Sequence, residues 1–292
     1  FDEERYFEPG RAPCVVDVDG TAVGLLICED VWYAGPARQA QDAGAQLIVV
    51  ANGSPYHTRQ HDARHAQVGA RARETGLPFA YANRVGGQDE LVFDGESTIV
   101  DERGSVVAAG RPFVEDLVLA DVQVESVFRA RLHDPRWRKA ESFIVGQCLE
   151  HSGISLPGRT FGGAKPPLAP YVPTEVDPRQ EVYQALVIGT RDYVRKNGFE
   201  TVVIGMSGGI DSTMVACIAH DALGPEHVVG VCLPSRFTAT RSVTDAQMVA
   251  RNLGIRLLDI PVEPAHQAFL AMLAETFTGL EADATEENLQ AR

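Results

Sequence analysis

The chain of 292 residues is long enough for two domains at the usual ~150 residues each, and either half can bury a core of its own. Its 40 acidic and 26 basic residues give a net charge of −14, which argues against a broad cationic surface for nucleic acid or anionic lipid. We therefore expect no nucleic-acid partner. No apolar stretch approaches the ~20 residues of a membrane-spanning helix, so we also expect no membrane span.

The five cysteines form an odd, widely spaced set without a Cys-x-x-Cys pair. This pattern favours neither a disulfide framework nor a zinc cluster, and a reducing, cytoplasmic compartment is the simpler interpretation. The N-terminus reads Phe-Asp-Glu-Glu-Arg and lacks both a Met and the basic-then-apolar pattern of a signal peptide. We interpret the chain as a segment of a longer one.

The first half predicts many strands and a few helices. Residues 14–28 predict a β-hairpin, because two apolar runs flank an Asp19-Gly20 turn that tolerates positive φ, and Cys28 then ends the second strand. Helices are expected over residues 35–43 and 61–75, and strands over 45–51, 79–82, 97–101, 105–109 and 117–122. This mixture predicts a layered α/β or α+β domain.

The second half predicts alternating strands and helices. Residues 125–174 are rich in Pro, Gly, Arg and His, which predicts a connector with a short helix near 137–150. After it come a helix over 179–197, strands over 201–206, 227–233 and 255–262, and intervening helices over 210–223 and 242–253. Such alternation predicts parallel strands with right-handed crossovers. We therefore divide the chain into a domain over 1–124, a linker over 125–174 and a domain over 175–292.

A glycine-rich turn, Ser-Gly-Gly-Ile-Asp-Ser at residues 207–212, joins the strand at 201–206 to the next helix. The glycines allow close approach of the backbone, the first helical amides point outward, and Ser207 and Ser212 add hydroxyl donors, so the turn suits pyrophosphate. It lacks the Walker A and Gly-x-Gly-x-x-Gly patterns. Asp211 would repel phosphates unless a cation lay between them, which makes it a candidate Mg²⁺ ligand. The alternative is a purely structural turn capped by serine.

This turn resembles the pyrophosphate loop of N-type ATP pyrophosphatases, and residues 203–213, 233–237 and 285–292 are similar to glutamine-dependent NAD synthetases in particular. The resemblance implies that ATP adenylates the nicotinate carboxylate of deamido-NAD, pyrophosphate leaves, and ammonia displaces AMP. It implies that Asn288 and Arg292 contact deamido-NAD, although Asn288 could instead be a helix cap or a surface residue. The implied ATP-binding residues are Gly205, Met206, Ser207, Gly208, Gly209, Ile210, Asp211 and Ser212, with Mg²⁺ on Asp211.

Cys28 is the candidate nucleophile. A lone cysteine at a strand end is most often a core residue, because reactivity needs a nearby base or positive charge. Residues 25–32, 52–56 and 86–95 nevertheless resemble the nitrilase-type glutaminase domain that precedes the same synthetase. By that resemblance Cys28 attacks the glutamine carboxamide, forms a γ-glutamyl thioester and releases ammonia. The family's catalytic glutamate and lysine cannot be assigned, since no lysine precedes Lys139.

The same resemblance implies that Ser54, Gln60 and Glu29 contact glutamine. Gln60 stands where a basic residue is common in the family, and Glu29 could equally form a structural salt bridge. His57, His61 and His65 recur at a spacing of four residues and could share a helix face as metal ligands. Because no acidic or cysteine partner is spaced to complete a site, we expect a solvated helix face there.

Together these patterns predict an α/β chain: the C-terminal part of a nitrilase-like α-β-β-α layered domain, then the start of a doubly wound parallel-sheet ATP-pyrophosphatase domain. The expected function is a ligase that amidates deamido-NAD to NAD with glutamine-derived ammonia, using ATP and Mg²⁺, in a cytoplasmic homo-oligomer. One alternative is another glutamine-dependent amidotransferase, which the nitrilase-like region disfavours. Others are a tRNA-modifying enzyme of this fold, which the charge disfavours, and, for the isolated segment, a non-catalytic nucleotide-binding module.

Overall fold

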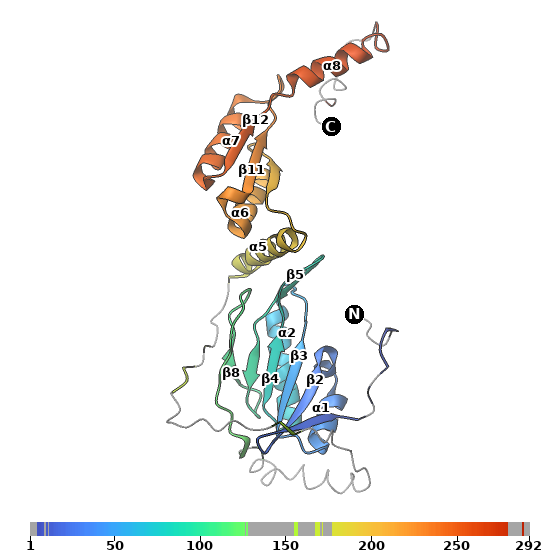
Figure 1. Ribbon diagram of the computed structural model, residues 1–292, viewed down its shortest axis with the longest axis vertical. Coiled ribbons are helices and arrows are strands. Elements are labelled where there is room, and N and C mark those ends of the chain that lie inside the picture. The colour runs from blue at the N-terminus through green and yellow to red at the C-terminus, as the bar shows by residue number, and fades with distance from the viewer. Residues whose placement is uncertain are drawn as a thin grey trace. The chain divides into compact units, whose positions relative to one another are not determined.

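The computed structural model describes residues 5–8, 10, 12–125, 127, 155–156, 167–169, 171, 177–279 and 288. The chain divides into two compact units (Figure 1). Unit 1 comprises Phe1–Gly86 and Leu91–Ala185, and unit 2 comprises Gly87–Glu90 and Leu186–Arg292. Within the described residues, no helix has the length and apolar character required to cross a membrane.

Unit 1 is built on a seven-stranded sheet of order β8-β7-β4-β3-β2-β1-β9. Strands β2, β3 and β4 run parallel to one another, whereas β1, β7 and β8 pair antiparallel with their neighbours β2, β4 and β7. The expected hairpin is confirmed, and Asp19 and Gly20 at its turn have φ values of 53° and 80°. The strands are β1 Cys14–Val18, β2 Thr21–Ile27, β3 Leu47–Asn52, β4 Phe79–Asn83, β7 Thr98–Val100, β8 Val106–Ala109 and β9 Ser155–Leu156.

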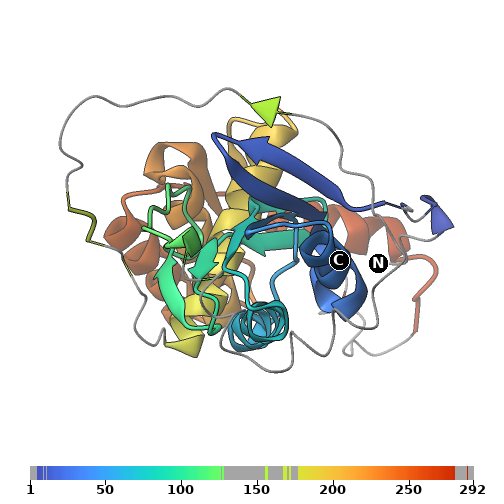
Figure 2. The ribbon, with the colours of Figure 1, turned by 90° about the horizontal axis from the view of Figure 1, so that it is seen from below.

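Helices α1 (Ala34–Asp42) and α2 (Gln60–Thr75) connect the parallel strands β2, β3 and β4. Their small and branched side chains join the sheet in one hydrophobic core, and the two helices cover the same face of the sheet (Figure 2). Gly24 in β2 allows α1 to approach, because an added Cβ would lie 3.1 Å from the Cβ of Ala40. The sheet and its two crossover helices therefore hold the carboxyl ends of three parallel strands in fixed register.

Three features of unit 1 differ from expectation. The strand expected over 117–122 is wrong: the segment pairs with no strand of the described sheets, and Leu117 and Leu119 are 79% and 52% exposed. A hairpin of β5 (Val85–Gln88) and β6 (Leu91–Asp94) was not expected, because the glycines there resemble a loop. Strand β9, inside the expected connector, pairs parallel with β1. The short helix expected near 137–150 lies outside the described residues.

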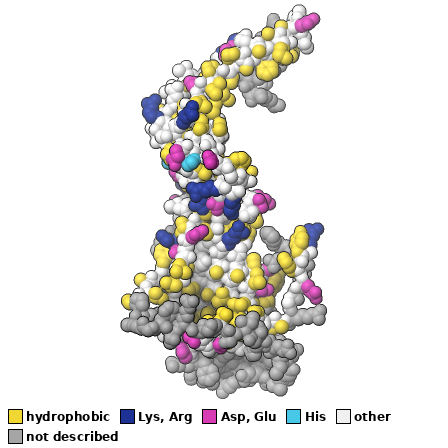
Figure 3. All heavy atoms as spheres, viewed as in Figure 1, with side chains coloured by type: hydrophobic (Ala, Val, Ile, Leu, Met, Phe, Trp, Pro, Cys, Tyr) yellow, Lys and Arg dark blue, Asp and Glu magenta, His cyan; other side chains and the backbone are white. Residues whose placement is uncertain are grey.

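The three parallel strands expected in the second half are confirmed in unit 2, in the order β10-β11-β12. Alanines of α6 and α7 pack against the sheet, with Ala216 and Ala246 fully buried. The last helix, α8, has exposed hydrophobic side chains, including Phe269 and Met272 at 50% and 76% (Figure 3). Helix α5 (Pro178–Lys196) belongs to unit 1 as far as Ala185 and to unit 2 from Leu186. The elements that follow it are β10 Val202–Gly205, α6 Ile210–Leu223, η3 Pro225–His227, β11 Val228–Cys232, α7 Thr240–Leu253, β12 Arg256–Asp259 and α8 Glu263–Leu273.

Candidate functional sites

Cys28 occupies a sharp turn between β2 and the short 3₁₀ helix η2, Cys28–Trp32. Its φ of +42° lies in the left-handed region, which is unfavourable for a residue with a Cβ. Two hydrogen bonds hold the turn: the Ile27 amide donates to Asp30 Oδ2 at 2.9 Å, and the Gln67 side chain donates to the Trp32 carbonyl at 2.8 Å. A half-buried thiol on a strained strand-to-helix turn is the arrangement that exposes a nucleophile.

A network of polar side chains lies at the carboxyl ends of β2, β3 and β4, on the same edge of the sheet as Cys28. Asn52 and Asn83 are register partners at the ends of β3 and β4, and the Asn52 amide donates to Asn83 Oδ1 at 2.9 Å. The Asn52 amide also donates to the Tyr81 hydroxyl. Burial raises the pKa of Tyr81, and the nearby thiol of Cys28 acts in the same direction. Cys28 therefore lies within electrostatic reach of this network.

Ser54, expected to contact glutamine, belongs to the same network. Its side chain is buried, and its backbone amide donates to Asn83 Oδ1 at 3.0 Å. The Asn83 side chain in turn donates to the Gly95 carbonyl at 2.7 Å, so Asn83 connects the segment after β3 to the segment after β6. The Asn52 carboxamide oxygen is buried and has no hydrogen-bond partner among the described residues. Such an acceptor favours a ligand that brings an N–H donor.

Sequence reasoning gave no role to Asn52, Tyr81 or Asn83. The available signal is positional: two polar residues end consecutive buried strands, and the carboxyl ends of parallel strands form one edge. Glu29, directly after Cys28, is half-buried and accepts a hydrogen bond from the Tyr33 hydroxyl at 3.3 Å. Gln60 begins α2, where its backbone amide donates to the His57 carbonyl at 2.9 Å. The contacts of Glu29 and Gln60 with glutamine stay predictions.

The glycine-rich turn of unit 2 lies between β10 and α6, as expected. Serine hydroxyls close it: the Gly209 amide donates to Ser207 Oγ at 3.2 Å, and Ser212 Oγ donates to the Gly209 carbonyl at 3.1 Å. Gly208 has a φ of +77°, and a Cβ there would lie 2.1 Å from the Ser242 carbonyl oxygen. Only glycine fits this position, and the first amides of α6 stay available for an anion.

The remaining residues expected to bind nucleotide differ in their surroundings. Met206 is a core residue, 2% exposed, and its amide donates to the Val231 carbonyl at 2.8 Å. Gly205 ends β10, and Ile210 is 81% exposed at the start of α6. Asp211 is exposed in the first turn of α6, and its role as a Mg²⁺ ligand stays a prediction.

Of the two residues expected to contact deamido-NAD, Asn288 is exposed, and Arg292 lies outside the described residues.

The solvated helix face expected for the histidines of α2 is wrong in part. His57 is exposed, whereas His61 and His65 are half-buried with ring centroids 4.1 Å apart. Glu96, distant in sequence, supplies the acidic partner that local spacing did not reveal, with Oε1 2.5 Å from His61 Nδ1. The hydrogen bond that His61 donates to the Glu96 carboxylate raises the pKa of His61, while burial lowers the pKa of His65 to about 4.

Comparison with known proteins finds similar families for both halves of the chain. Residues 1–131 match the carbon-nitrogen hydrolase family, and residues 182–292 match the NAD synthase family. Proteins named glutamine-dependent NAD(+) synthetase from Aquifex aeolicus and Thermotoga maritima are 41% and 42% identical over 100% of this chain, which covers 50% of each. The chain thus spans about half the length of the curated relatives it matches.

Solved structures agree with the expected fold. The glutamine-dependent NAD+ synthetase from Acinetobacter baumannii, solved in complex with ADP, is 33% identical with a TM-score of 0.76. The match covers 100% of this chain and 48% of that one. A glutamine-dependent NAD(+) synthetase from Cytophaga hutchinsonii, 16% identical with a TM-score of 0.67, covers 99% of this chain and 50% of that one and supports the fold alone. The expectation of a nitrilase-like domain followed by an NAD synthase domain is confirmed.

Proposed function

We propose that the full-length protein amidates deamido-NAD to NAD, because the chain is similar along its whole length to proteins named glutamine-dependent NAD(+) synthetase. Ammonia comes from glutamine, and ATP activates the acceptor. The observation that carries this proposal is the presence, in one chain, of the strained Cys28 turn and the Ser207–Ser212 loop. Each occupies the carboxyl ends of parallel strands, where α/β sheets bind ligands.

In unit 1, the Cys28 thiol transfers its proton to a general base, and its sulfur attacks the glutamine carboxamide carbon. The C–N bond breaks, ammonia leaves, and water then hydrolyses the γ-glutamyl thioester to glutamate and free thiol. Ser54, Glu29 and Gln60 bind the substrate. The unpartnered Asn52 carboxamide oxygen supports this assignment, because the glutamine side chain carries N–H donors.

In unit 2, the nicotinate carboxylate of deamido-NAD attacks the α-phosphorus of ATP, and pyrophosphate leaves. Ammonia then attacks the activated carbonyl, and AMP departs with the electron pair of the broken C–O bond. Residues Gly205 to Ser212 bind ATP and orient its phosphates, and Asn288 and Arg292 bind deamido-NAD. Mg²⁺ held by Asp211 would neutralise phosphate charge. The loop fits these groups because the first amides of α6 have no intrahelical acceptor and lie where they can donate to phosphate oxygens.

The experiment compares the two nitrogen donors in the full-length protein. Cys28→Ala is expected to abolish NAD formation from glutamine and to leave ammonium-dependent formation within about twofold of wild type. Asp211→Asn is expected to lower the rate with both donors, since the charge at the phosphates is lost. Mass spectrometry of NAD, AMP and pyrophosphate reports the products. Absence of NAD from deamido-NAD, ATP and ammonium would overturn the assignment.

The expected cytoplasmic location and the expected oligomeric state are part of the same proposal. A cytoplasmic location is supported by the described cysteines Cys14, Cys28, Cys217 and Cys232, all of which are free thiols. A homo-oligomer rests on the family resemblance. Cell fractionation tests the first, and light scattering of the full-length protein tests the second. Secretion into an oxidising compartment, or a monomeric mass at all concentrations, would contradict them.

A further inference from the structure

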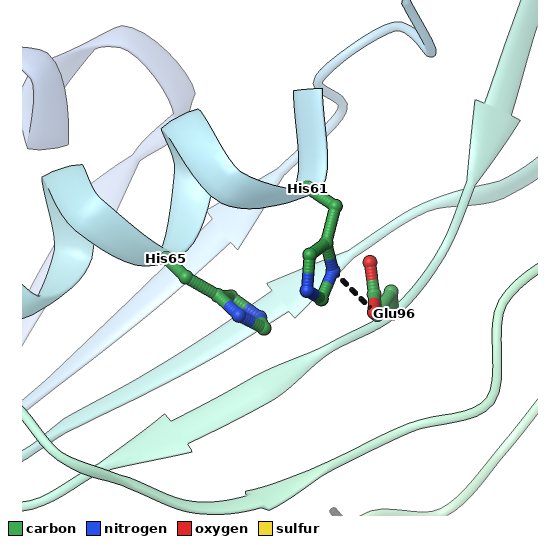
Figure 4. A group of neighbouring side chains, drawn as sticks. All are labelled: His61, His65 and Glu96. Atoms are coloured by element: carbon green, nitrogen blue, oxygen red, sulfur yellow. Dashed lines mark ion pairs between the residues drawn. The ribbon is translucent and has the colours of Figure 1, made fainter. Parts of the chain in front are cut away.

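Two helical histidines and a distant glutamate of unit 1 form a group with the composition of a metal site (Figure 4). His61 and His65 lie one turn apart on α2, and Glu96 lies between β6 and β7. One donor atom from each of the three lies within 4.8 Å of the others. Two imidazoles and a carboxylate are a ligand set that Zn²⁺ accepts.

The backbone of Glu96 indicates that this carboxylate is held in place. Glu96 is 6% exposed and has a φ of +55°, a left-handed conformation that is unfavourable for a residue with a Cβ. Asn83 and Arg64 fix the preceding residue, since both donate to the Gly95 carbonyl, at 2.7 Å and 3.3 Å. The fold therefore maintains a strained, buried carboxylate against two half-buried histidines.

The hydrogen bonds of Thr98 orient the second imidazole. The Thr98 hydroxyl donates to the Glu96 carbonyl at 3.1 Å, so its oxygen accepts from His65 Nε2–H at 2.9 Å. This tautomer leaves His65 Nδ1 with a free lone pair. An imidazole whose other nitrogen donates to an oxygen is the arrangement found around metal-ligating histidines.

The surroundings carry more negative than positive charge. Arg64, whose charge acts on both histidines, is paired with Asp94. Asp62 on α2 and Glu181 at the start of α5 add carboxylates, and burial with the charges of Asp94 and Glu96 raises the pKa of Glu181. A bound divalent cation would offset this excess. His61 is 35% exposed, which leaves a path for the ion from solvent.

We propose that His61, His65 and Glu96 bind one divalent transition-metal ion of the Zn²⁺ class, with water in the remaining position. The ion replaces the proton between His61 Nδ1 and Glu96 Oε1. Small side-chain rotations bring the donor atoms to the spacing of about 3.3 Å that tetrahedral Zn²⁺ requires. Binding of the ion would hold the Gly95–Thr98 segment in place. Asn83 forms hydrogen bonds with this segment. The proposed ligands include neither Cys28 nor any residue of the nucleotide loop, so the inference stands independently of the proposed activity.

The test uses full-length Cys28→Ala protein stripped with a chelator, because a free thiolate at Cys28 would itself bind Zn²⁺. Excess Mg²⁺ occupies the oxygen-ligand sites during calorimetric titration with Zn²⁺. We expect one equivalent of Zn²⁺ to bind, and at least tenfold weaker binding after His65→Ala or Glu96→Gln. His57→Ala, a change of an exposed histidine just before the same helix, is the matched control and should leave affinity unchanged.

Co²⁺ provides a second measurement that does not depend on variant stability. Replacement of Zn²⁺ by Co²⁺ should give visible absorption bands of tetrahedral geometry in the Cys28→Ala protein. Thr98→Val should weaken Zn²⁺ binding about 10–100-fold while the bands keep their shape, because only the orienting hydrogen bond is lost. The proposal is overturned if the Cys28→Ala protein binds no Zn²⁺, or binds it as tightly after His65→Ala as before.

Discussion

Arg64 and Asp94 form a buried ion pair in which one guanidinium nitrogen, Arg64 Nη2, donates to both carboxylate oxygens, at 2.8 Å to Oδ1 and 2.7 Å to Oδ2. Each side chain is only 3% exposed. Arg64 comes from α2 and Asp94 ends β6, so the pair joins the helix that carries His61 and His65 to the segment that carries Glu96. Arg64 thereby supports both the histidine group and Gly95, to which Asn83 is bonded.

Removal of one partner of this pair is expected to be strongly destabilising. Asp94→Ala leaves the Arg64 guanidinium buried without its counter-charge, and the expected loss is about 3–5 kcal/mol of unfolding free energy. Thermal unfolding of the full-length protein measures the change. The double variant Arg64→Met/Asp94→Leu should be more stable than Asp94→Ala, because no buried charge is left alone. A double variant less stable than Asp94→Ala would contradict this account.

Because the backbone at Cys28 is strained, we predict that the stability of a Cys28 variant depends on the residue that replaces the cysteine. An alanine at this position has a Cβ and so keeps the free-energy cost of a φ of +42°, whereas a glycine has no Cβ and avoids that cost. Cys28→Gly should therefore be more stable than Cys28→Ala by about 1 kcal/mol, or about 2–4 °C in Tm. Both variants lack the thiol, so neither should form NAD from glutamine. Equal Tm values for the two would show that the strain is relieved elsewhere.

The sequence predicts those features that depend on neighbouring residues. Asp19-Gly20 marks the first hairpin, and the glycines after α2, α6 and α7 mark three helix ends because each adopts positive φ. The alternation of strands and helices predicts the parallel sheet of unit 2. Each of these signals lies within a few residues of the structure it predicts.

Features that depend on tertiary contacts escaped prediction. The spacing of His61 and His65 is visible along α2, but Glu96 reaches them only after β4 and the β5–β6 hairpin have formed. A strand also needs a partner: the apolar run at 117–122 has a strand-like pattern yet joins none of the described sheets. The bonds of Asn83 to Ser54 and Gly95 likewise arise from the packing of separate strands.

Asn83 is expected to be a positioning residue for glutamine. Asn83→Ala removes the acceptor of the Ser54 amide and the donor to the Gly95 carbonyl. Loss of the hydrogen bond that holds the Ser54 amide, about 1 kcal/mol, predicts a rise in KM for glutamine of about fivefold. The ammonium-dependent rate is the control and should not change. An equal fall with both donors would indicate general unfolding instead.

Adjacent glycines of the nucleotide loop should respond differently to the same substitution. Gly208→Ala places a Cβ 2.1 Å from the Ser242 carbonyl at a φ of +77°, so the loop must move. Gly209 has a φ of −81°, and its nearest contact would be Ser207 Oγ at 3.2 Å. We expect Gly208→Ala to lower the ammonium-dependent rate at least 100-fold, and Gly209→Ala to lower it much less. Calorimetric titration with ATP separates lost binding from lost chemistry, and equal losses for the two variants would argue against a steric cause.

The Arg236–Glu263 ion pair of unit 2 predicts a pH-dependent contribution to stability. Hydrogen bonds from Arg236 and Gln267 lower the pKa of Glu263 from 4.5 to about 2. Because the folded-state pKa is below the unfolded one, the pair stabilises fully above pH 4.5, and its contribution is lost as the pH falls toward 2. Arg236→Gln should therefore lower Tm slightly at neutral pH, and this difference should shrink below pH 4.5. Added salt should reduce the neutral-pH difference, since both groups are solvent-accessible. A difference in Tm that stays constant as the pH falls would show that Arg236 stabilises unit 2 through packing and not through its charge.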